Sequence, residues 1–431
     1  MARIGIRRED KSRWEVRVPL VPAAIGRLIK DDGVEVAVQT SPTRAFSDEQ
    51  YKAAGAAIAD DLNDCPIILG VKEIPLEKLN RDKTYVYFSH TIKGQAENMP
   101  MLERLLELGC NLIDYEKIVN DKGQRLVFFS HFAGIAGMID SLWALGKRLT
   151  HEGIDSPLNR IEQAHRYRDL THVREAFGDV AELIRAGGLP EAISPLVCGF
   201  AGYGQVSRGA QEIYDLLPAQ EIAPGDLDCV EPAADVCYKV VFKEEHMVRR
   251  VDASSPFDLQ EYYTKPQLYE ADFFEYIPHL SVLMNCIYWE SKYPCMLTGE
   301  QLRELYAGPQ PKLRVIGDIT CDIDGSMECT THATEPDSPV YVYDPDTGAT
   351  QDGVAGRGPV VLAVDFLPCE VPVDASKAFS DALLPFIPAL AVAEFSKPLS
   401  ESGLPQELQR AVIVYHGELT EPYRYLQQYV T

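Results

Sequence analysis

Three residues near the start of the chain have side chains that could transfer protons and bind a carboxylate. Lys72 directly follows the apolar run Ile-Ile-Leu-Gly-Val, His90 directly follows Tyr-Val-Tyr-Phe-Ser, and Arg17 precedes Val-Pro-Leu-Val-Pro. Polar residues at the carboxyl ends of parallel strands face the crevice where ligands bind. A histidine titrates near neutral pH, a lysine beside cations in a crevice is shifted toward neutrality, and an arginine fork matches a carboxylate. Taken singly, each is more often a solvated charge or a structural histidine. Together they predict an acid–base pair, Lys72 and His90, beside a carboxylate-binding Arg17.

A glycine-rich turn farther along the chain has the context of a phosphate-binding loop. Gly202-Tyr-Gly204-Gln-Val-Ser-Arg-Gly209-Ala210 lies between an apolar strand and an amphipathic helix. Gly202 permits the tight turn, Gly204 lets the backbone approach a pyrophosphate, and Gly209 with Ala210 allows the helix to pack closely on the strand. The free N–H groups at the helix start would then bind the diphosphate. Because the spacing departs from G-x-G-x-x-G, an ordinary strand-to-helix turn is the alternative.

The strand expected next, at 219–223, bears on the choice of cofactor. An NAD-specific domain usually ends this strand with an acidic residue that binds the ribose hydroxyls. Here the strand ends in Ala-Pro-Gly, with Glu221 expected in its middle and Asp226 only later. Arg208, in the preceding helix, could instead bind the 2′-phosphate of NADP(H). The pattern favours NADP(H), with NAD(H) as the alternative.

Short apolar runs alternate with amphipathic helices, which predicts parallel sheets flanked by helices. We expect strands in the first part of the chain at 3–7, 34–39, 66–71, 84–88 and 111–115. A second β/α series begins with a strand at 194–199, and the helical tail 378–429 is expected to return to the first domain. The predicted fold is α/β with two Rossmann-like domains and the active site in the cleft between them. Residues 1–138 plus 365–431 would form the catalytic domain, and residues 139–364 the dinucleotide-binding domain.

The composition argues against several other classes of protein. The 431 residues carry a formal net charge of −24, which disfavours nucleic acid binding. The ten cysteines are scattered without a CxxC pair, so we expect no metal site and reduced thiols in a cytoplasmic protein. The charged start, Met-Ala-Arg-Ile-Gly-Ile-Arg-Arg, is not that of a signal peptide. Ser130, His131 and Asp140 interrupt the apolar stretch 126–146, so we expect a buried helix there and no membrane span.

Several motifs, in order along nearly the whole chain, resemble one known family. They are Arg-Arg-Glu-Asp, Trp-Glu and Arg17-x-Pro-Leu-x-Pro; Ile-Leu-Gly-Val-Lys72; Phe-Ser-His90-Thr-Ile-Lys93; Leu-Ile-Asp-Tyr-Glu116-Lys; Ala133-Gly-Ile-Ala-Gly137-Met-Ile; Gly-Gln-Val-Ser207-Arg-Gly-Ala-Gln; Asn285-x-Ile-Tyr288-Trp-Glu; and Asp318-Ile-x-x-Asp322. The chain resembles the lysine–2-oxoglutarate reductase half of the aminoadipic semialdehyde synthase family. Fungal saccharopine dehydrogenase and alanine dehydrogenase look like more distant relatives.

The resemblance implies a role for each matched residue. Lys72 and His90 would form the acid–base pair, and Arg17 would hold a substrate carboxylate. Glu116 would tune the site. Further substrate-binding residues are Lys93 and His131, although relatives carry Gln or Phe where this chain has His131. The implied cofactor-binding residues are Gly202, Gly204, Gln205, Val206, Ser207, Asn285, Ile287, Asp318 and Asp322. Gln205 replaces an Asn of the family, and Asp322 is the next candidate for catalysis.

The resemblance further implies NAD(P)H-dependent condensation of L-lysine with 2-oxoglutarate to saccharopine, or the reverse reaction, as the first step of lysine degradation. The expected partners are these small molecules, and self-association into a homo-oligomer is left open. The chain ends where the second, glutamate-forming half of the relatives would begin, so we expect a monofunctional enzyme. One alternative is an opine-type or alanine dehydrogenase that acts on another amine and keto acid. The other is a nucleotide-sensing relative without catalysis, which the joint presence of Lys72, His90 and Arg17 disfavours.

Overall fold

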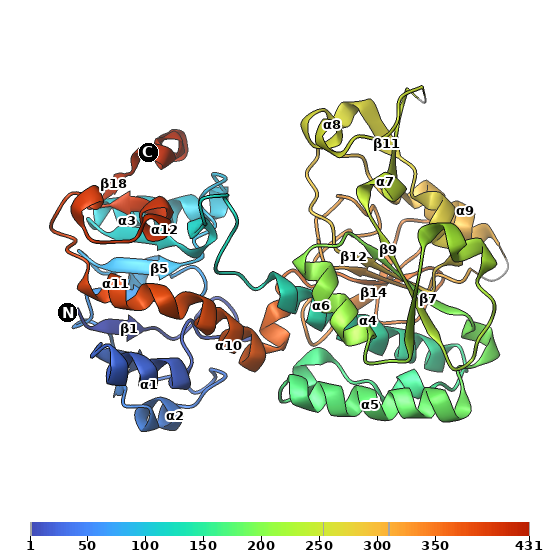
Figure 1. Cartoon of the computed structure of the whole chain (residues 1–431), viewed down its shortest axis with the longest axis horizontal. Coiled ribbons are helices and arrows are strands. Elements are labelled where there is room, and N and C mark those ends of the chain that lie inside the picture. The colour runs from blue at the N-terminus through green and yellow to red at the C-terminus, as the bar shows by residue number, and fades with distance from the viewer. Residues whose placement is uncertain (1, 253, 309–310, 431) are drawn as a thin grey trace. The chain divides into compact units, whose positions relative to one another are not determined.

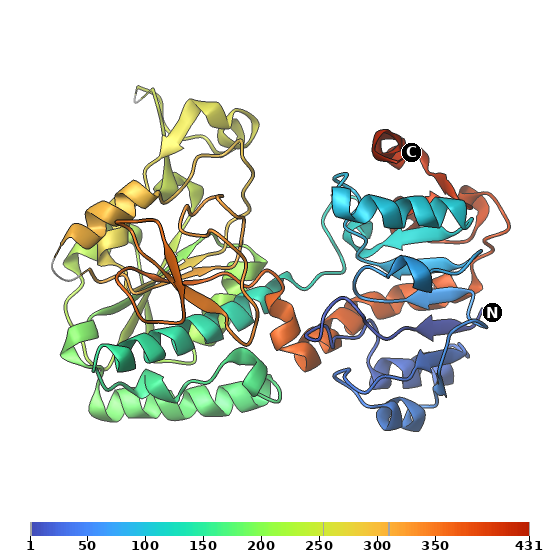
Figure 2. The same cartoon turned by 180° about the vertical axis from the view of Figure 1, so that it is seen from behind.

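The computed structural model describes residues 2–252, 254–308 and 311–430. The chain forms two compact units, Met1–Phe129 with Pro372–Thr431, and Ser130–Val371. Each unit is built on its own mostly parallel sheet flanked by helices (Figures 1 and 2), as the sequence predicts. The predicted boundary at 138 falls inside a single long helix, α4 (Ser130–His151), which belongs entirely to the second unit.

The first unit contains an eight-stranded sheet with the order β18-β17-β6-β5-β4-β1-β2-β3. Its strands are β1 Ile4–Ile6, β2 Val36–Gln39, β3 Ala57–Ala59, β4 Ile67–Leu69, β5 Thr84–Tyr87, β6 Asn111–Asp114, β17 Val412–Tyr415 and β18 Glu418–Leu419. Strands β1 to β6 are parallel to one another, and β17 pairs antiparallel with β6. Its helices are α1 Pro22–Asp31, α2 Asp48–Ala53, α3 Met99–Glu107, α10 Pro372–Leu383, α11 Ile387–Val392 and α12 Gln406–Ala411. The tail therefore returns to the first unit as expected, but it adds two strands as well as helices.

Helix α10 fixes the segment that carries Arg17. The hydroxyl oxygens of Ser376 and Ser380 accept hydrogen bonds from the backbone N–H groups of Val18 at 3.0 Å and Val21 at 3.1 Å. The stretch Pro372–Val392 is long and apolar enough to cross a membrane. Its hydroxyl contacts with Val18 and Val21 are nevertheless those of a helix packed inside a globular domain.

The second unit contains an eight-stranded sheet with the order β15-β14-β16-β13-β12-β7-β9-β8. Its strands are β7 Leu196–Ala201, β8 Ala219–Ile222, β9 Cys237–Phe242, β12 Val282–Asn285, β13 Val315–Asp318, β14 Val340–Tyr343, β15 Thr350–Asp352 and β16 Val360–Leu362. The six strands β16, β13, β12, β7, β9 and β8 are parallel to one another. At one edge of the sheet, β14 pairs antiparallel with β16, and β15 pairs antiparallel with β14. Besides α4 and the two short helices of the insertion described below, its helices are α5 Leu170–Gly187, α6 Gln205–Tyr214 and α9 Gly299–Ala307. Helices α4 and α5 run side by side in both views (Figures 1 and 2).

An insertion between β9 and β12 forms a small separate layer on the second unit. It comprises α7 Glu244–Met247, the antiparallel pair β10 Val248–Arg250 and β11 Tyr269–Ala271, and α8 Leu259–Thr264. Rings of Phe257, Tyr262 and Tyr269 pack against one another within it. Tyr262 and Tyr269 belong to the same hydrophobic core as residues of β7, β9 and β12, so the insertion packs on the second unit.

Candidate active site

Lys72 and His90 come from neighbouring parallel strands of the first unit. Lys72 follows β4 and His90 follows β5, and these strands pair in register from Ile67 with Thr84 to Leu69 with Val86. Both residues therefore leave the sheet at the same edge. Glu73 connects them, since it follows Lys72 in the chain and its Oε1 lies 2.6 Å from His90 Nδ1. Glu73 was not assigned a role from the sequence, although its position directly after Lys72 was a usable signal.

Burial and nearby charges shift the titration of this cluster. Burial, and then the charge of Arg17, lower the pKa of the Lys72 ammonium below its ordinary value. Burial alone would raise the pKa of Glu73, but the hydrogen bond and charge of His90 outweigh it and lower that pKa to about 2. Glu73 is therefore a carboxylate at neutral pH that orients the His90 ring through Nδ1.

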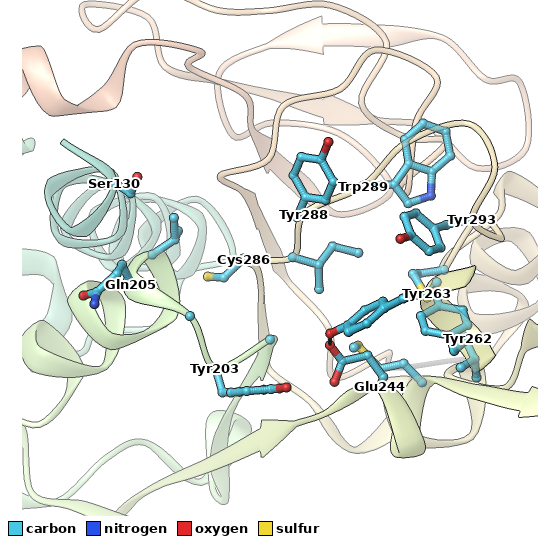
Figure 3. A pocket seen from close by; sticks show the side chains of 17 residues that line it. Ser130, Tyr203, Gln205, Glu244, Tyr262, Tyr263, Cys286, Tyr288, Trp289 and Tyr293 are labelled. Atoms are coloured by element: carbon cyan, nitrogen blue, oxygen red, sulfur yellow. Dashed lines mark hydrogen bonds between the residues drawn. The ribbon is translucent and has the colours of Figure 1, made fainter. Parts of the chain in front are cut away.

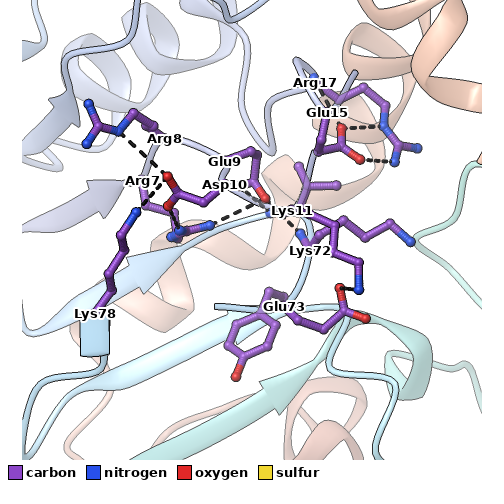
Figure 4. A network of polar contacts seen from close by, with 12 residues as sticks. Arg7, Arg8, Glu9, Asp10, Lys11, Glu15, Arg17, Lys72, Glu73 and Lys78 are labelled. Atoms are coloured by element: carbon purple, nitrogen blue, oxygen red, sulfur yellow. Dashed lines mark hydrogen bonds and ion pairs between the residues drawn. The ribbon is translucent and has the colours of Figure 1, made fainter. Parts of the chain in front are cut away.

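A second buried carboxylate, that of Glu9, holds the backbone around Lys72. Its two oxygens accept the N–H groups of Val71 at 2.9 Å and Lys72 at 3.0 Å. Burial raises the pKa of Glu9 to about 7, against the opposing charge of Arg7. Figure 4 shows Lys72, Glu73 and the Arg17–Glu15 pair on one side of this polar network. Glu9 is a further residue that the sequence analysis did not assign.

Arg17 is buried and paired in the structure. Its Nε donates to Glu15 Oε1 at 2.8 Å, and a second ion pair joins the same two side chains. Its guanidinium carbon lies 4.2 Å from the centre of the Phe129 ring. That ring stacks on Phe379 of α10 with their centres 4.3 Å apart. The returning tail thus supports the surface on which Arg17 lies.

The other two predicted substrate residues of this unit lie at the same sheet edge but have their own contacts. Lys93 is exposed on the loop after β5, and its backbone N–H donates to Gln95 Oε1 at 3.0 Å. Glu116 lies after β6 and forms an ion pair with Arg125. None of the described contacts of Lys93 or Glu116 reaches Lys72 or His90, so their substrate-binding roles remain predictions.

The glycine-rich turn of the second unit has the geometry of a dinucleotide-binding loop. Gly202 has a φ of +93°, which favours glycine, and Gly204 precedes the first residue of α6. A side chain at Gly204 would meet nothing within 4 Å, so the backbone is open to a ligand there. The N–H groups that start α6 are thus accessible to a diphosphate.

Gly209 has a different packing role from the one predicted. A Cβ at Gly209 would lie 1.9 Å from the carbonyl oxygen of His131, and one at Gly134 would lie 1.8 Å from the carbonyl oxygen of Val206. Both glycines thus allow α6 to pack directly against helix α4. The close contact is between two helices and not between helix and strand, because α4 covers the face of α6 that Gly209 occupies.

A pocket of about 670 Å³ opens beside this turn, entirely within the second unit (Figure 3). The residues that line it are Ser130, Gly202, Tyr203, Gly204, Gln205, Val206, Glu244, Met247, Val248, Tyr262, Tyr263, Cys286, Ile287, Tyr288, Trp289, Tyr293 and Met296. Its volume and mixed apolar and polar lining suit a small organic ligand. Five of these positions, all on the turn or after β12, were assigned to cofactor binding from the sequence, whereas Glu244 and the aromatic residues were assigned no role. The many tyrosines of the insertion were the available signal.

Other predicted cofactor residues support the pocket from within the protein. Asn285 and Asp318 are buried neighbours on β12 and β13, and Asn285 Nδ2 donates to Asp318 Oδ1 at 2.8 Å. Ser207 is buried on α6 and accepts a hydrogen bond from Gln211 at 3.0 Å. Asp322 follows β13 and does not line the pocket. Asn285 and Asp318 thus join the ends of β12 and β13, whereas the bond of Ser207 lies within α6.

His131 lies on α4 in the second unit. Its Nε2 is 2.9 Å from Glu212 Oε2 of α6, and Arg174 binds the other oxygen of Glu212 at 2.9 Å. The structure therefore places His131 in the packing of α4 on α6, and its substrate-binding role remains a prediction. Among the described residues, no group of three or more His, Cys, Asp or Glu side chains could hold a metal ion.

Comparison with known proteins agrees with this geometry. Residues 5–136 match the model of the N-terminal domain of the alanine dehydrogenase/PNT family, and residues 289–422 match that of its C-terminal domain. The chain is 39% identical to an alpha-aminoadipic semialdehyde synthase of Arabidopsis thaliana, over 98% of this chain and 41% of that protein. The chain therefore spans less than half the length of that relative.

Two further proteins are similar over most of both chains. A saccharopine dehydrogenase [NAD(+), L-lysine-forming] of Emericella nidulans is 27% identical over 89% of this chain and 90% of that protein. The structure of an L-alanine dehydrogenase superposes with a TM-score of 0.64, at 18% identity, over 99% of this chain and 98% of that one. The resemblance read from the motifs is thereby confirmed. The chain belongs to the alanine dehydrogenase/PNT family and is related along nearly its whole length to the aminoadipic semialdehyde synthases.

Proposed function

We propose that this chain catalyses the reductive condensation of L-lysine with 2-oxoglutarate to saccharopine, and its reverse. The observation that carries the proposal is the Lys72–Glu73–His90 cluster at the edge of one sheet, together with a glycine-turn pocket in the other unit. The relatives are named for aminoadipic semialdehyde synthesis and for lysine-forming saccharopine dehydrogenation, which supports these substrates.

The reaction needs several proton transfers near neutral pH. The ε-amine of lysine attacks the keto carbon of 2-oxoglutarate, water leaves to give an imine, and hydride addition with a proton gives the secondary amine. Because Glu73 holds His90 through Nδ1, the Nε2 atom of His90 is the nitrogen available to a substrate. Lys72, with its lowered pKa, is the second acid–base group, since it can be neutral at a pH where an exposed lysine is charged.

Arg17 is proposed to bind a carboxylate of the keto acid. Its guanidinium is already aligned by Glu15 and supported by the Phe129 ring, so little freedom is lost on binding. Arg17→Ala is expected to raise the KM for 2-oxoglutarate at least about tenfold, with a smaller effect on the KM for lysine. Steady-state kinetics with each substrate varied in turn tests this.

The second unit is proposed to bind the nicotinamide dinucleotide. The open backbone at Gly204 and the start of α6 fit a diphosphate, and the apolar Ile287 lines the same pocket. When bound, this cofactor supplies the hydride. The sequence favoured NADP(H) because the strand after the glycine turn, now seen as β8, ends without an acidic residue and Arg208 is nearby. The structure places β9 between β7 and β8, so that argument does not apply to this sheet. The fungal relative is named for NAD(+).

A decisive experiment measures cofactor oxidation with lysine and 2-oxoglutarate together, and with each omitted in turn. We expect oxidation only with both substrates, and mass spectrometry should detect saccharopine. Lys72→Met should lower the rate at least about a hundredfold, whereas Lys78→Met, which removes a surface lysine paired with Asp10, should not change it. Oxidation with another amine or keto acid, but not with this pair, would favour an opine-type or alanine dehydrogenase. Cofactor binding without turnover on any pair would favour a nucleotide sensor.

A further inference from the structure

The strand beside the glycine turn is not the next strand in the sequence. Strand β9 pairs with β7 along its whole length, from Leu196 with Cys237 to Ala201 with Phe242, and β8 lies beyond β9 at the sheet edge. The N–H of Gly202 donates to the carbonyl oxygen of Phe242 at 2.9 Å. In a dinucleotide-binding domain, the end of the strand adjoining the glycine turn presents the group that meets the ribose next to the adenine. In this chain, that position falls directly after Phe242.

Glu244 is the second residue after this strand end, and it lines the pocket together with Gly202 and Gly204. The hydroxyl of Tyr263 donates to its Oε1 at 2.6 Å, as the dashed line in Figure 3 shows. Tyr203, on the glycine turn, lies close enough that burial and then the charge of Glu244 raise the pKa of the Tyr203 hydroxyl. The carboxylate is therefore held in place at the turn, by a tyrosine from the insertion.

The charges around the pocket favour a ligand with hydroxyls at this point over one with a phosphate. Glu244 is the only Asp, Glu, Lys, Arg or His among the described residues that line it. Lys243 is exposed and lies outside the lining. The nearest arginines along the chain are engaged elsewhere, since Arg249 pairs with Glu270 and Asp272, and Arg250 pairs with Asp252 and Glu261. Arg208 is exposed on α6 and also lies outside the lining.

We infer that Glu244 accepts hydrogen bonds from the vicinal ribose hydroxyls of NAD(H) and that its charge disfavours the 2′-phosphate of NADP(H). Glu244 is then the residue that sets cofactor preference, and the preference is opposite to the one read from the sequence. A phosphate carrying between one and two negative charges would meet a carboxylate, with no cation in the pocket lining to compensate. The inference rests on the proposed function only in taking this pocket as the dinucleotide site.

The test measures binding rather than turnover. NADH and NADPH are titrated separately into the full chain, and the dissociation constants are determined by calorimetry for the parent, Glu244→Gln and Glu245→Gln. Glu245 is exposed and does not line the pocket, so it is the matched control. We expect the parent to bind NADH at least about tenfold more tightly than NADPH, because hydrogen bonds to a charged acceptor carry this much discrimination. Glu244→Gln should weaken NADH binding about tenfold without weakening NADPH binding, and Glu245→Gln should change neither.

The outcomes separate this inference from the proposed reaction. Tighter binding of NADPH by the parent, or equal loss of both nucleotides in Glu244→Gln, would overturn the role of Glu244. The parent comparison needs no variant, so a misfolded variant could not obscure it. A clear NADH preference in a chain that does not turn over lysine and 2-oxoglutarate would leave the inference standing and refute the proposed reaction. Binding of neither nucleotide would refute the assignment of the pocket itself.

Discussion

Glu73→Gln tests whether one buried carboxylate both stabilises the first unit and orients His90. The parent side chain is 11% exposed, with Oε1 at 2.6 Å from His90 Nδ1 and Oε2 at 3.5 Å from Lys11 Nζ. Glutamine keeps the shape and can still accept a hydrogen bond, but it carries no charge. The substitution therefore removes mainly the ionic part of the contact with His90.

The pKa of Glu73 sets the size and the pH range of the effect. The difference between 4.5 in the unfolded chain and about 2 in the folded chain corresponds to about 3 kcal/mol in favour of the folded carboxylate. As the pH falls below about 4.5, the unfolded chain takes up a proton that the folded chain does not, so folding becomes less favourable. This contribution is complete above about pH 5 and is lost as the pH falls toward 2. Glu73→Gln should cost up to about 3 kcal/mol at pH 7 and progressively less at lower pH.

Urea unfolding at pH 7, 5 and 3.5 measures the difference. Trp14 reports on the first unit if Trp143 and Trp289, which lie in the second unit, are replaced by Phe in parent and variant alike. Glu77→Gln, on an exposed side chain of the same loop, is the control and should leave stability unchanged. The kcat of Glu73→Gln should fall at least about tenfold, because the His90 ring loses its charged anchor. An unfolding free energy equal to that of the parent at pH 7, or a deficit that does not shrink with acidification, would refute the reasoning.

Other expectations follow from the same structure. Lys72→Met and His90→Gln should each lower kcat at least about a hundredfold and leave nucleotide binding nearly intact. Each should also remove one limb of the bell-shaped pH profile of kcat. Turnover within a few-fold of the parent would show that other residues carry the acid–base role. Gly209→Ala should destabilise the chain by about 1–3 kcal/mol and weaken nucleotide binding, because the added Cβ would meet a backbone oxygen of α4. The matched Gly178→Ala on α5, where the Cβ meets nothing within 4 Å, should stabilise it by up to about 1 kcal/mol; thermal melts compare the two. Burial raises the pKa of Glu370 to about 8, so the folded protein retains a proton that the unfolded chain releases, and stability should fall as the pH rises from about 5 to 8. Glu370→Gln should flatten that decline in urea unfolding, and an unchanged slope would count against the buried neutral acid.

The sequence by itself determined the features that depend on local patterns. Apolar runs of strand length alternate with helices, so the α/β class and both parallel sheets could be predicted. Lys72 and His90 each follow such a run, and parallel neighbours end at one edge, which brings both residues to the same place. The glycine turn could be predicted because the roles of Gly202 and Gly204 depend on the local backbone conformation. The family resemblance added the likeness to aminoadipic semialdehyde synthases, which the comparisons confirm.

The tertiary structure alone decided which strands and helices are neighbours. Sheet order does not follow chain order, so the sequence could not show that β9 adjoins β7 and brings Glu244 to the glycine turn. Gly209 packs on α4, a helix far earlier in the chain, for which the motif carries no signal. The strand β17 in the tail forms because β6 offers an unpaired edge, although its residues follow a helical stretch. Likewise, burial by itself raises the pKa of both Glu9 and Glu73. The pKa of Glu73 is nevertheless lowered overall, because the hydrogen bond and charge of His90 outweigh the effect of burial. Hydrophobic periodicity and turn-forming residues can be recognised from residues adjacent in the sequence. Strand pairing, side-chain packing and burial depend on residues that only the folded chain brings together.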